Sequence, residues 1–178
     1  IGKPRSFSNC SSVIFLTSAV TYAGYIDFIS GTSLSQVEVT FTEEVRRIFK
    51  LYDILSLKDI GFNKEIVEDG LSFQENAMIK ANAVMDYIKN DLKKDYAVIA
   101  DDTGLCIKAL NYEPGIYSAR YSGGTDEDNR RKVLDKMITI QDRTAYFQCF
   151  VALLMPDGES ILADGKTYGL ITKSKIGD

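Results

Sequence analysis

Residues 96–100 (YAVIA) constrain the fold of this chain more than any other stretch, because they are apolar without interruption. A strand that is apolar at every position is buried on both faces, as in α/β proteins whose helices cover a mostly parallel sheet. The run has the length of one strand and stops at Asp101 and Asp102, where charge begins. We therefore expect a buried central strand over 96–100 with two carboxylates at its carboxyl end.

Helical and strand patterns alternate along the rest of the chain. Helical spacing of apolar residues covers 43–51, 72–92 and 126–137. Strand patterns cover 13–16, 54–57, 145–154, 160–164 and 168–172, with a turn at 156–158 that makes a hairpin. Ser72 followed by Glu75 is typical of a capping box at the start of the middle helix. This order predicts an α/β fold with a mixed, twisted sheet flanked by helices.

The chain changes character near residue 42. Asp27 and Glu38 are the only charged residues over 6–42, where Ser and Thr are frequent, whereas charge is dense from residue 43 onward. A chain of 178 residues, 45% of them hydrophobic, is long enough for one domain with a sizeable core. We therefore expect an atypical segment over 1–42, with the sequence for one strand, and an organised domain over 43–178.

The sequence contains no histidine, which removes much of the usual chemistry of active sites. Ser-His-Asp and Cys-His nucleophile systems are excluded, as are zinc and iron sites that depend on histidine. Acid–base catalysis has to come from Asp, Glu, Lys or Tyr. A bound metal has to be a hard, oxygen-ligated cation such as Mg²⁺, Mn²⁺ or Ca²⁺.

Charge, cysteine content and hydropathy exclude further classes. A net charge of −4 argues against nucleic-acid binding through a basic face. Three widely spaced cysteines without a C-x-x-C pair form neither a disulfide framework nor a zinc site, and they predict a reducing cytoplasm. The most apolar stretch, residues 13–29, contains Thr17, Ser18, Thr21 and Asp27, which argues against a membrane partner.

The first candidate for chemistry is the motif Asp101-Asp102-Thr103-Gly104. Ligands bind at the carboxyl edge of open α/β sheets, and neighbouring residues at a strand end point to opposite faces. One carboxylate can then ligate a metal while the other orients it. The alternative is a simple turn, since Asp, Thr and Gly all favour turns. The motif by itself leaves both interpretations open.

Two weaker candidates lie on either side of this motif. Glu68 and Glu75 border the start of the helix over 72–92, where they are candidate metal ligands or only a loop charge and a helix cap. Lys80 follows on the same helix and has the alternative of an ordinary surface charge. Arg120 lies in a glycine-bounded loop over 114–124 (PGIYSARYSGG), where it is a candidate phosphate donor or part of an ordered loop packed by tyrosines.

Together these motifs are far more specific than any one of them. Their order is E-D-G-x-S-F-x-E-N-A-x-x-K-A over 68–81, A-D-D-T-G-L over 100–105 and P-G-x-Y-S-A-R-Y-S-G over 114–123. This pattern closely resembles the inosine triphosphate pyrophosphatase, or Ham1-like, family. The resemblance runs from residue 43 to 178 and includes D-G-K-T-Y-G over 164–169. A Maf-like pyrophosphatase of related fold is the alternative, and the second and third motifs argue against it.

The resemblance implies an enzyme that hydrolyses ITP, dITP and XTP to the monophosphate and pyrophosphate. It implies that Asp102 is the catalytic carboxylate and that Asp101, Glu68 and Glu75 complete an acidic cluster around Mg²⁺, for which Mn²⁺ is a possible substitute. In the family pattern Thr103 and Lys80 face the substrate. We add Arg120 to the substrate-binding residues as the candidate phosphate donor described above. We further expect a cytoplasmic homodimer that acts on a purine nucleoside triphosphate.

The sequence also departs from the family pattern. The family opens with a strand followed by T/S-x-N-x-x-K, but no lysine lies between Lys3 and Lys50. The F-G-[YW]-D and S-H-R segments that recognise the base are also missing, so we expect a chain incomplete at both ends. One hypothesis is an active enzyme in which Arg46, Arg47 or a partner subunit supplies the missing functions. The other is a weak or inactive fragment that keeps the fold and a dimer surface. A nucleic-acid-binding module is the hypothesis that the sequence favours least, because the chain has a net negative charge.

Overall fold

The computed structural model describes residues 12–16, 26–28, 47 and 50–174, and the side chains of 14–16 and 26–28 lie outside this description. The described residues divide into two compact units. The first unit contains 12–16, 47, 50–102 and 150–163, and the second contains 26–28, 103–149 and 164–174. The helix expected over 43–51 falls almost entirely outside the described residues.

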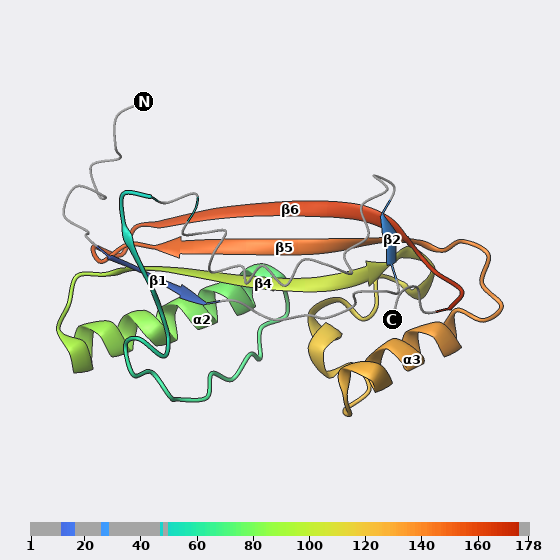
Figure 1. Cartoon of the computed structure of the whole chain (residues 1–178), viewed down its shortest axis with the longest axis horizontal. Coiled ribbons are helices and arrows are strands. Elements are labelled where there is room, and N and C mark those ends of the chain that lie inside the picture. The colour runs from blue at the N-terminus through green and yellow to red at the C-terminus, as the bar shows by residue number, and fades with distance from the viewer. Residues whose placement is uncertain (1–11, 17–25, 29–46, 48–49, 175–178) are drawn as a thin grey trace. The chain divides into compact units, whose positions relative to one another are not determined.

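Six strands of the described residues form one sheet, and its mixed character confirms the expected α/β fold, although the strand over 26–28 was not among the expected strands. The six strands are β1 (Ser12–Leu16), β2 (Ile26–Phe28), β3 (Asp53–Ser56), β4 (Ala97–Ile107), β5 (Thr144–Leu154) and β6 (Ser160–Ile171). Their order is β2-β6-β5-β4-β1-β3 (Figure 1). β1 pairs in parallel with both β3 and β4, whereas β2 pairs antiparallel with β6.

The central strand β4 confirms the expectation of burial on both faces. Val98 and Ala100 pack into the core under the helix α2 (Phe73–Tyr87), while Ala97 and Ile99 pack into a second core with Val13 of β1. Neighbouring strand residues point to opposite faces, so an uninterrupted apolar run serves two cores at once.

The expected end of this strand at residue 100 is wrong, because β4 continues through Asp101 and Asp102 to Ile107. The residues beyond the aspartates are apolar again, and Leu105 and Ile107 are fully buried. The partner β1 does stop there, since its last pair joins Leu16 to Ala100. The two aspartates therefore follow the carboxyl edge of the parallel part of the sheet while remaining inside a strand.

The C-terminal hairpin is also more continuous than expected. β5 and β6 are joined at 155–159, where the Met155 amide donates to the Glu159 carbonyl over 2.8 Å. The two strands expected at 160–164 and 168–172 are one strand, β6, without a break at Gly165. The polar residues over 164–167 form no turn, because β6 lies beside β5 along a strand of similar length and ladder hydrogen bonds hold it extended.

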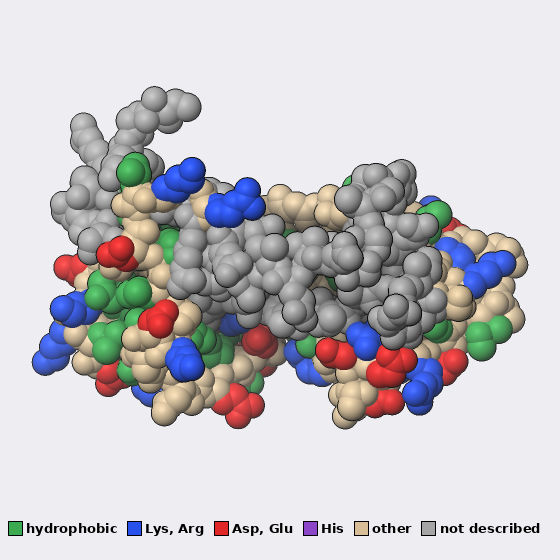
Figure 2. Space-filling view, viewed as in Figure 1, with side chains coloured by type: hydrophobic (Ala, Val, Ile, Leu, Met, Phe, Trp, Pro, Cys, Tyr) green, Lys and Arg blue, Asp and Glu red, His purple; other side chains and the backbone are tan. Residues whose placement is uncertain are grey.

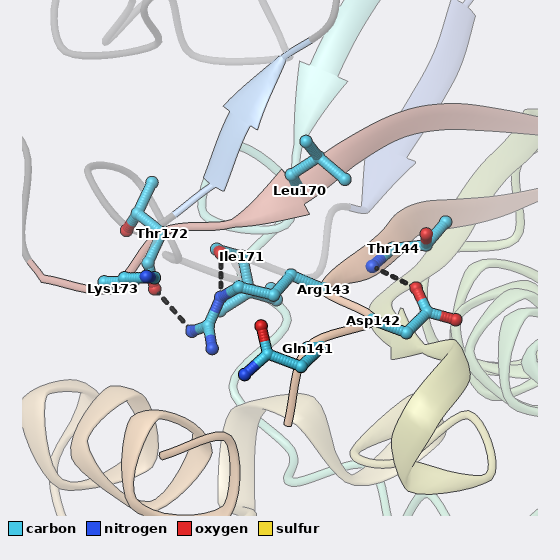
Figure 3. Close-up of a pocket in the computed structure, with 8 residues that line it drawn as sticks. All are labelled: Gln141, Asp142, Arg143, Thr144, Leu170, Ile171, Thr172 and Lys173. Carbon is cyan, nitrogen blue, oxygen red and sulfur yellow. Dashed lines mark hydrogen bonds between the residues drawn. The ribbon is translucent and has the colours of Figure 1, made fainter. Parts of the chain in front are cut away.

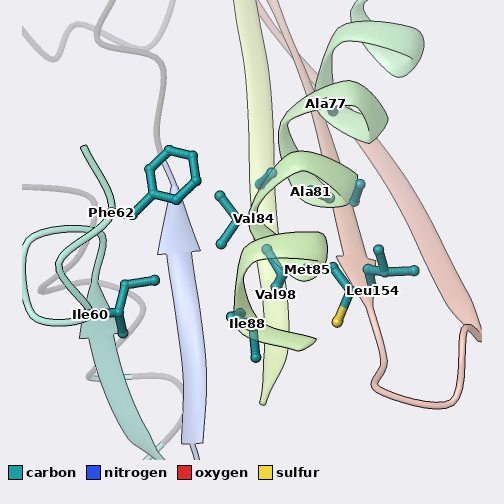
Figure 4. Close-up of a cluster of buried hydrophobic side chains, with 11 residues drawn as sticks. Ile60, Phe62, Ala77, Ala81, Val84, Met85, Ile88, Val98 and Leu154 are labelled. Carbon is teal, nitrogen blue, oxygen red and sulfur yellow. The ribbon is translucent and has the colours of Figure 1, made fainter. Parts of the chain in front are cut away.

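Helix α2 forms as its apolar spacing predicts. Ala77, Ala81, Val84 and Ile88 are buried against β4 and β5 in the first unit (Figure 4). A π-helical turn, η3 (Ile88–Leu92), continues α2 until Lys93 adopts a left-handed conformation with φ 53°. The helical run thus ends where the sequence indicates.

The start of α2 is capped differently from the expected box. The Ser72 hydroxyl accepts the Glu75 amide at 3.2 Å, which is the first half of the box. The Glu75 carboxylate, however, accepts from the amide of Leu71 at 2.7 Å. The reciprocal bond therefore reaches one residue beyond Ser72, into the loop before the helix.

The second unit has its own core around the helix α3 (Asp126–Lys136), which confirms the expected helix over 126–137 within one residue. A complete capping box between Thr125 and Asp128 begins this helix. Its core is formed by Leu105, Ile107, Val133, Met137, Ala145 and Ile171. Two 3₁₀ turns, η4 (Lys108–Leu110) and η5 (Gly115–Arg120), connect β4 to α3. None of the described helices has the length and apolar character that a bilayer crossing requires.

Candidate active site

Lys80 is the unusual residue of the first unit. It lies on the buried face of α2, between Ala77 and Ala81, and only 5% of it is exposed. Its ammonium is 3.0 Å from Oδ1 of Asp102 and 3.3 Å from Oε2 of Glu68. The alternative that Lys80 is an ordinary surface charge is therefore wrong. Burying a charged ammonium is strongly unfavourable unless carboxylates pair with it, because the ammonium loses its hydration on burial.

Asn76 is the second donor to Asp102. It precedes Lys80 by one helical turn and is completely buried. Its Nδ2 donates to Oδ2 of Asp102 at 3.2 Å, and its Oδ1 accepts the amide of Gly70 at 2.9 Å. Because Gly70 offers a donor, the oxygen of the Asn76 amide faces the loop and the nitrogen faces Asp102.

Gly70 lies too close to α2 for any other residue. A Cβ added there would be 2.6 Å from Oδ1 of Asn76 and 2.9 Å from Cβ of Glu75. Real Cβ atoms do not approach this closely, so the backbone packs against the helix only because residue 70 has no side chain. This contact holds the loop that carries Glu68 against the start of α2.

The two aspartates of β4 are both buried, at 3% exposure for Asp101 and 5% for Asp102. By strand alternation Asp102 shares the face of Val98 and Ala100, which α2 covers, and Asp101 belongs to the opposite face. The arrangement separates the two adjacent carboxylates, as the sequence motif suggests. Asp102 is the one that meets the helix.

Glu75 lies in the first turn of the same helix. Its carboxylate accepts from the Leu71 amide in the preceding loop at 2.7 Å, and its role as a metal ligand stays a prediction. Among the described residues, no three acidic or thiol side chains gather closely enough to hold a metal ion by themselves. Glu68 and Asp102 instead flank a single ammonium.

This pair of carboxylates still suits Mg²⁺. That cation is usually bound through one or two carboxylates, with water and substrate phosphates completing its shell. Among the described residues, Glu68 and Asp102 provide two carboxylates around the one ammonium of Lys80. The oxygen donors are hard, and the chain lacks the histidines that would favour softer metals.

Thr103 and Arg120 lie in the second unit. Thr103 is half-buried in β4. Arg120 is exposed at the end of η5, and its guanidinium lies 5.2 Å from the centre of the Tyr117 ring. The contacts of both residues with a substrate stay predictions.

The second unit contains a pocket of about 450 Å³, lined by residues 141–144 and 170–173 (Figure 3). Arg143 extends along it, and its guanidinium donates to the carbonyls of Met137 at 2.9 Å and Thr172 at 2.7 Å, and to that of Ile171. These bonds tie the end of β6 to the segment after α3. The arginine in this pocket therefore has a structural use.

Tyr146 and Cys106, two neighbouring side chains of the second unit, have raised pKa values. Burial raises the pKa of Tyr146 to about 12, and Cys106 beside it adds to the shift. Burial likewise raises the pKa of the Cys106 thiol, against a hydrogen bond with Tyr146 that lowers it. Both groups stay protonated at pH 7 and offer no general base there.

Charges of both signs are interspersed on the face of the described residues in Figure 2. α3 is the most charged element, with acidic residues in its first turn and Lys136 in its last. Such a mixture forms no basic stripe on that face of the kind that nucleic-acid-binding domains present.

Comparison with known proteins gives consistent matches. The model of the Ham1 family matches residues 42–178. A dITP/XTP pyrophosphatase of Clostridium perfringens is 40% identical over 142 residues, which are 76% of this chain and 70% of that protein. The enzyme of the same name from Leuconostoc mesenteroides is 42% identical over 127 residues, which are 70% of this chain and 61% of its own length.

The fold agrees with solved structures. The Staphylococcus aureus Ham1 protein superposes with a TM-score of 0.70 at 30% identity, covering 94% of this chain and 75% of that one. A dITP/XTP pyrophosphatase of Mycobacterium abscessus gives a TM-score of 0.65 at 28% identity, covering 90% and 75% of the two chains.

Proposed function

The chain belongs to the Ham1 family, and we propose that it hydrolyses ITP, dITP and XTP to the nucleoside monophosphate and pyrophosphate. The observation that carries this proposal is the buried ammonium of Lys80 between the carboxylates of Glu68 and Asp102. A buried cation beside carboxylates suits a polyphosphate that arrives with its own metal. The names of the similar proteins favour this activity over an inactive fragment.

Glu68 and Asp102 would hold Mg²⁺, or Mn²⁺ in its place, and the cation would neutralise phosphate charge during the reaction. Glu75 is a third proposed ligand, although one of its carboxylate oxygens also accepts from the Leu71 amide. Lys80 adds a fixed positive charge from the side of α2. A triphosphate carries about four negative charges, so a site in which Lys80 was the only cation would bind the triphosphate poorly.

Asp102 is the proposed catalytic carboxylate. It orients a water molecule toward the α-phosphorus and accepts its proton as the new O–P bond forms. The bond between the α-phosphorus and the bridging oxygen breaks, and pyrophosphate leaves with the electron pair. Lys80 and Asn76 hold one oxygen of Asp102 each, so the carboxylate is oriented before substrate arrives. Asp101 contributes charge and orientation from the neighbouring strand position.

Finer parts of the proposal concern the whole molecule. We place the catalytic part at 43–178, with 1–42 as an atypical segment that contributes β1 and β2, and assign substrate contacts to Thr103 and Arg120. Exposed apolar side chains on β6, including Tyr168 and Leu170, support a homodimer. Cys106 and Cys149 are thiols that form no disulfide, which supports a reducing cytoplasm. The acidic balance and interspersed charges support a role without nucleic-acid or membrane partners.

The test is release of pyrophosphate from ITP, dITP and XTP by the purified chain with Mg²⁺, with ATP and GTP as comparison substrates. We expect pyrophosphate as the product and faster turnover of the deaminated purines. Release of orthophosphate, or equal turnover of all five nucleotides, would contradict the proposal.

A further inference from the structure

We propose that Asn76 is a positioning residue for the reaction, coupling the loop of Glu68 to the carboxylate of Asp102. The inference rests on the proposed function, because it assigns Asp102 the catalytic step. Asn76 has two contacts that no other described residue combines. Its oxygen receives the Gly70 amide at 2.9 Å, and its nitrogen donates to Asp102 at 3.2 Å.

The geometry leaves Asn76 little freedom. The residue is completely buried, and its own amide donates to the Ser72 carbonyl in the first turn of α2. The side chain therefore comes from a rigid point of the helix. A displacement of the loop at Gly70 would be transmitted to Asp102 through one planar amide, whose two ends cannot move independently.

Lys80 completes the coupling. It contacts Asp102 through Oδ1 and Glu68 through Oε2, so the loop and the strand are joined both by the ammonium and by the amide. Lys80 connects the loop and the strand through two ion pairs, whereas Asn76 connects them through two directional hydrogen bonds. With donors on both of its oxygens, the Asp102 carboxylate is fixed against rotation, which preorganises it for the attacking water.

The second unit provides a matched control in Asn129. This residue is also buried, and it lies four residues after the N-cap Thr125, as Asn76 lies four residues after Ser72. Its oxygen accepts a loop amide, from Ser122 at 2.6 Å, but its nitrogen donates to a backbone carbonyl, that of Ala119, at 2.9 Å. Asn129 anchors a loop without touching a carboxylate.

The experiment compares Asn76→Asp with Asn129→Asp. Each substitution keeps an acceptor for the loop amide and replaces the donating nitrogen with oxygen. We expect Asn76→Asp to lower kcat for ITP about 10–100-fold, the usual effect of losing an outer partner of a functional group, with KM little changed. Asn129→Asp should lower the Tm but leave kcat within about twofold, any displacement of the Arg120 loop acting on KM.

Two outcomes would overturn the inference. If both variants lower kcat in proportion to their loss of Tm, Asn76 is only a structural anchor. If Asn76→Asp raises KM with kcat retained, Asn76 contacts substrate and does not position Asp102.

A reversal experiment tests the contact without relying on activity. Asn76→Asp combined with Asp102→Asn exchanges donor and acceptor. We therefore expect the double variant to recover at least about half of the decrease in Tm that Asn76→Asp causes alone. Asn129→Asp combined with Asp102→Asn should show no such recovery. Failure to recover would remove the proposed contact even in an active enzyme. Recovery in a protein that does not hydrolyse ITP would show that the proposed function, and not the contact, is at fault.

Discussion

The two units use the same device at the start of a helix and differ one turn later. In each, a buried asparagine four residues after the N-cap accepts an amide from the preceding loop. Four residues further on, the first unit has Lys80 and the second has Val133, both buried. The valine joins an apolar core, whereas the lysine requires a carboxylate on β4 and another on the loop. The candidate active site therefore differs from the purely structural contact at one buried helix position. Lys80 and its two carboxylate partners are present in the first unit, and Val133 is present in the second.

The largest effect should come from removing the charge of Asp102. Asp102→Asn is nearly isosteric and should lower kcat about 10²–10⁴-fold, because general-base assistance by a positioned carboxylate has that magnitude. Circular dichroism should show an unchanged fold. Turnover close to that of the parent protein would assign catalysis to another residue.

Lys80→Met tests the stability side of the comparison. It leaves Asp102 and Glu68 without their cation in a buried setting, which should destabilise the protein by about 3–5 kcal/mol in urea unfolding. Val133→Met, the matched change in the second unit, exchanges one apolar side chain for another and should cost less than about 3 kcal/mol. Equal losses would mean that the ion pairs contribute nothing beyond packing.

The loop glycines sharpen the comparison further. Gly70→Ala would force a Cβ against the Glu75 Cβ and the Asn76 backbone, and should cost about 1–3 kcal/mol with a lowered kcat. At Gly124 the new Cβ would meet the Asp128 side chain at 2.7 Å, which can move away at the expense of its cap. Gly124→Ala should therefore cost about 1 kcal/mol and leave kcat unchanged. Thermal unfolding and ITP kinetics on both variants decide the matter.

The smallest effect concerns pH and the second unit. A hydrogen bond from Lys136, followed by one from Tyr121, lowers the pKa of Glu113. A carboxyl group with a lowered folded pKa stabilises the protein above its unfolded value of about 4.3, and this contribution is lost as pH falls through the folded pKa. Both side chains of the pair are more than 40% exposed, so the effect is small.

Glu113→Gln tests this contribution directly. It should lower the Tm by no more than about 3 °C at pH 7, and this loss should become smaller as the pH falls below the unfolded pKa of about 4.3. Lys136 has a raised pKa, so its share persists from neutral pH up to the alkaline range. A loss at pH 3 equal to that at pH 7 would contradict the assignment.

Much of the fold could be predicted because apolar spacing reports burial directly. Helices α2 and α3 and the two-sided burial of β4 follow from their patterns. The continuation of β4 through Asp101 and Asp102 could not, because a strand tolerates buried carboxylates only when distant partners neutralise them. The partners of Asp102, Lys80 and Asn76, are on another element, so local sequence patterns do not reveal them.

The site was accessible in part. The motifs named Glu68, Lys80 and Asp102 through a family resemblance, while the residues alone left Lys80 with the alternative of a surface charge. Asn76 was overlooked, although a signal exists. Asn76 and Lys80 are polar residues that interrupt the apolar stripe of Ala77, Ala81 and Val84 at helical spacing. Polar residues on a buried face require partners, and a search for such interruptions would have found both.

The two-sided burial of β4 has a consequence for how the chain finds its native pairing. A strand with apolar residues on only one face is held in register by hydrophobicity, since a slip of one residue exposes that face. Residues 97–100 are apolar on both faces, so the same slip would exchange one buried set for another at little cost in apolar area. The contacts of Asp102 with Lys80 and Asn76 distinguish the two alignments, because only one of them brings this carboxylate to α2. The residues proposed for chemistry thus also specify the register of the central strand.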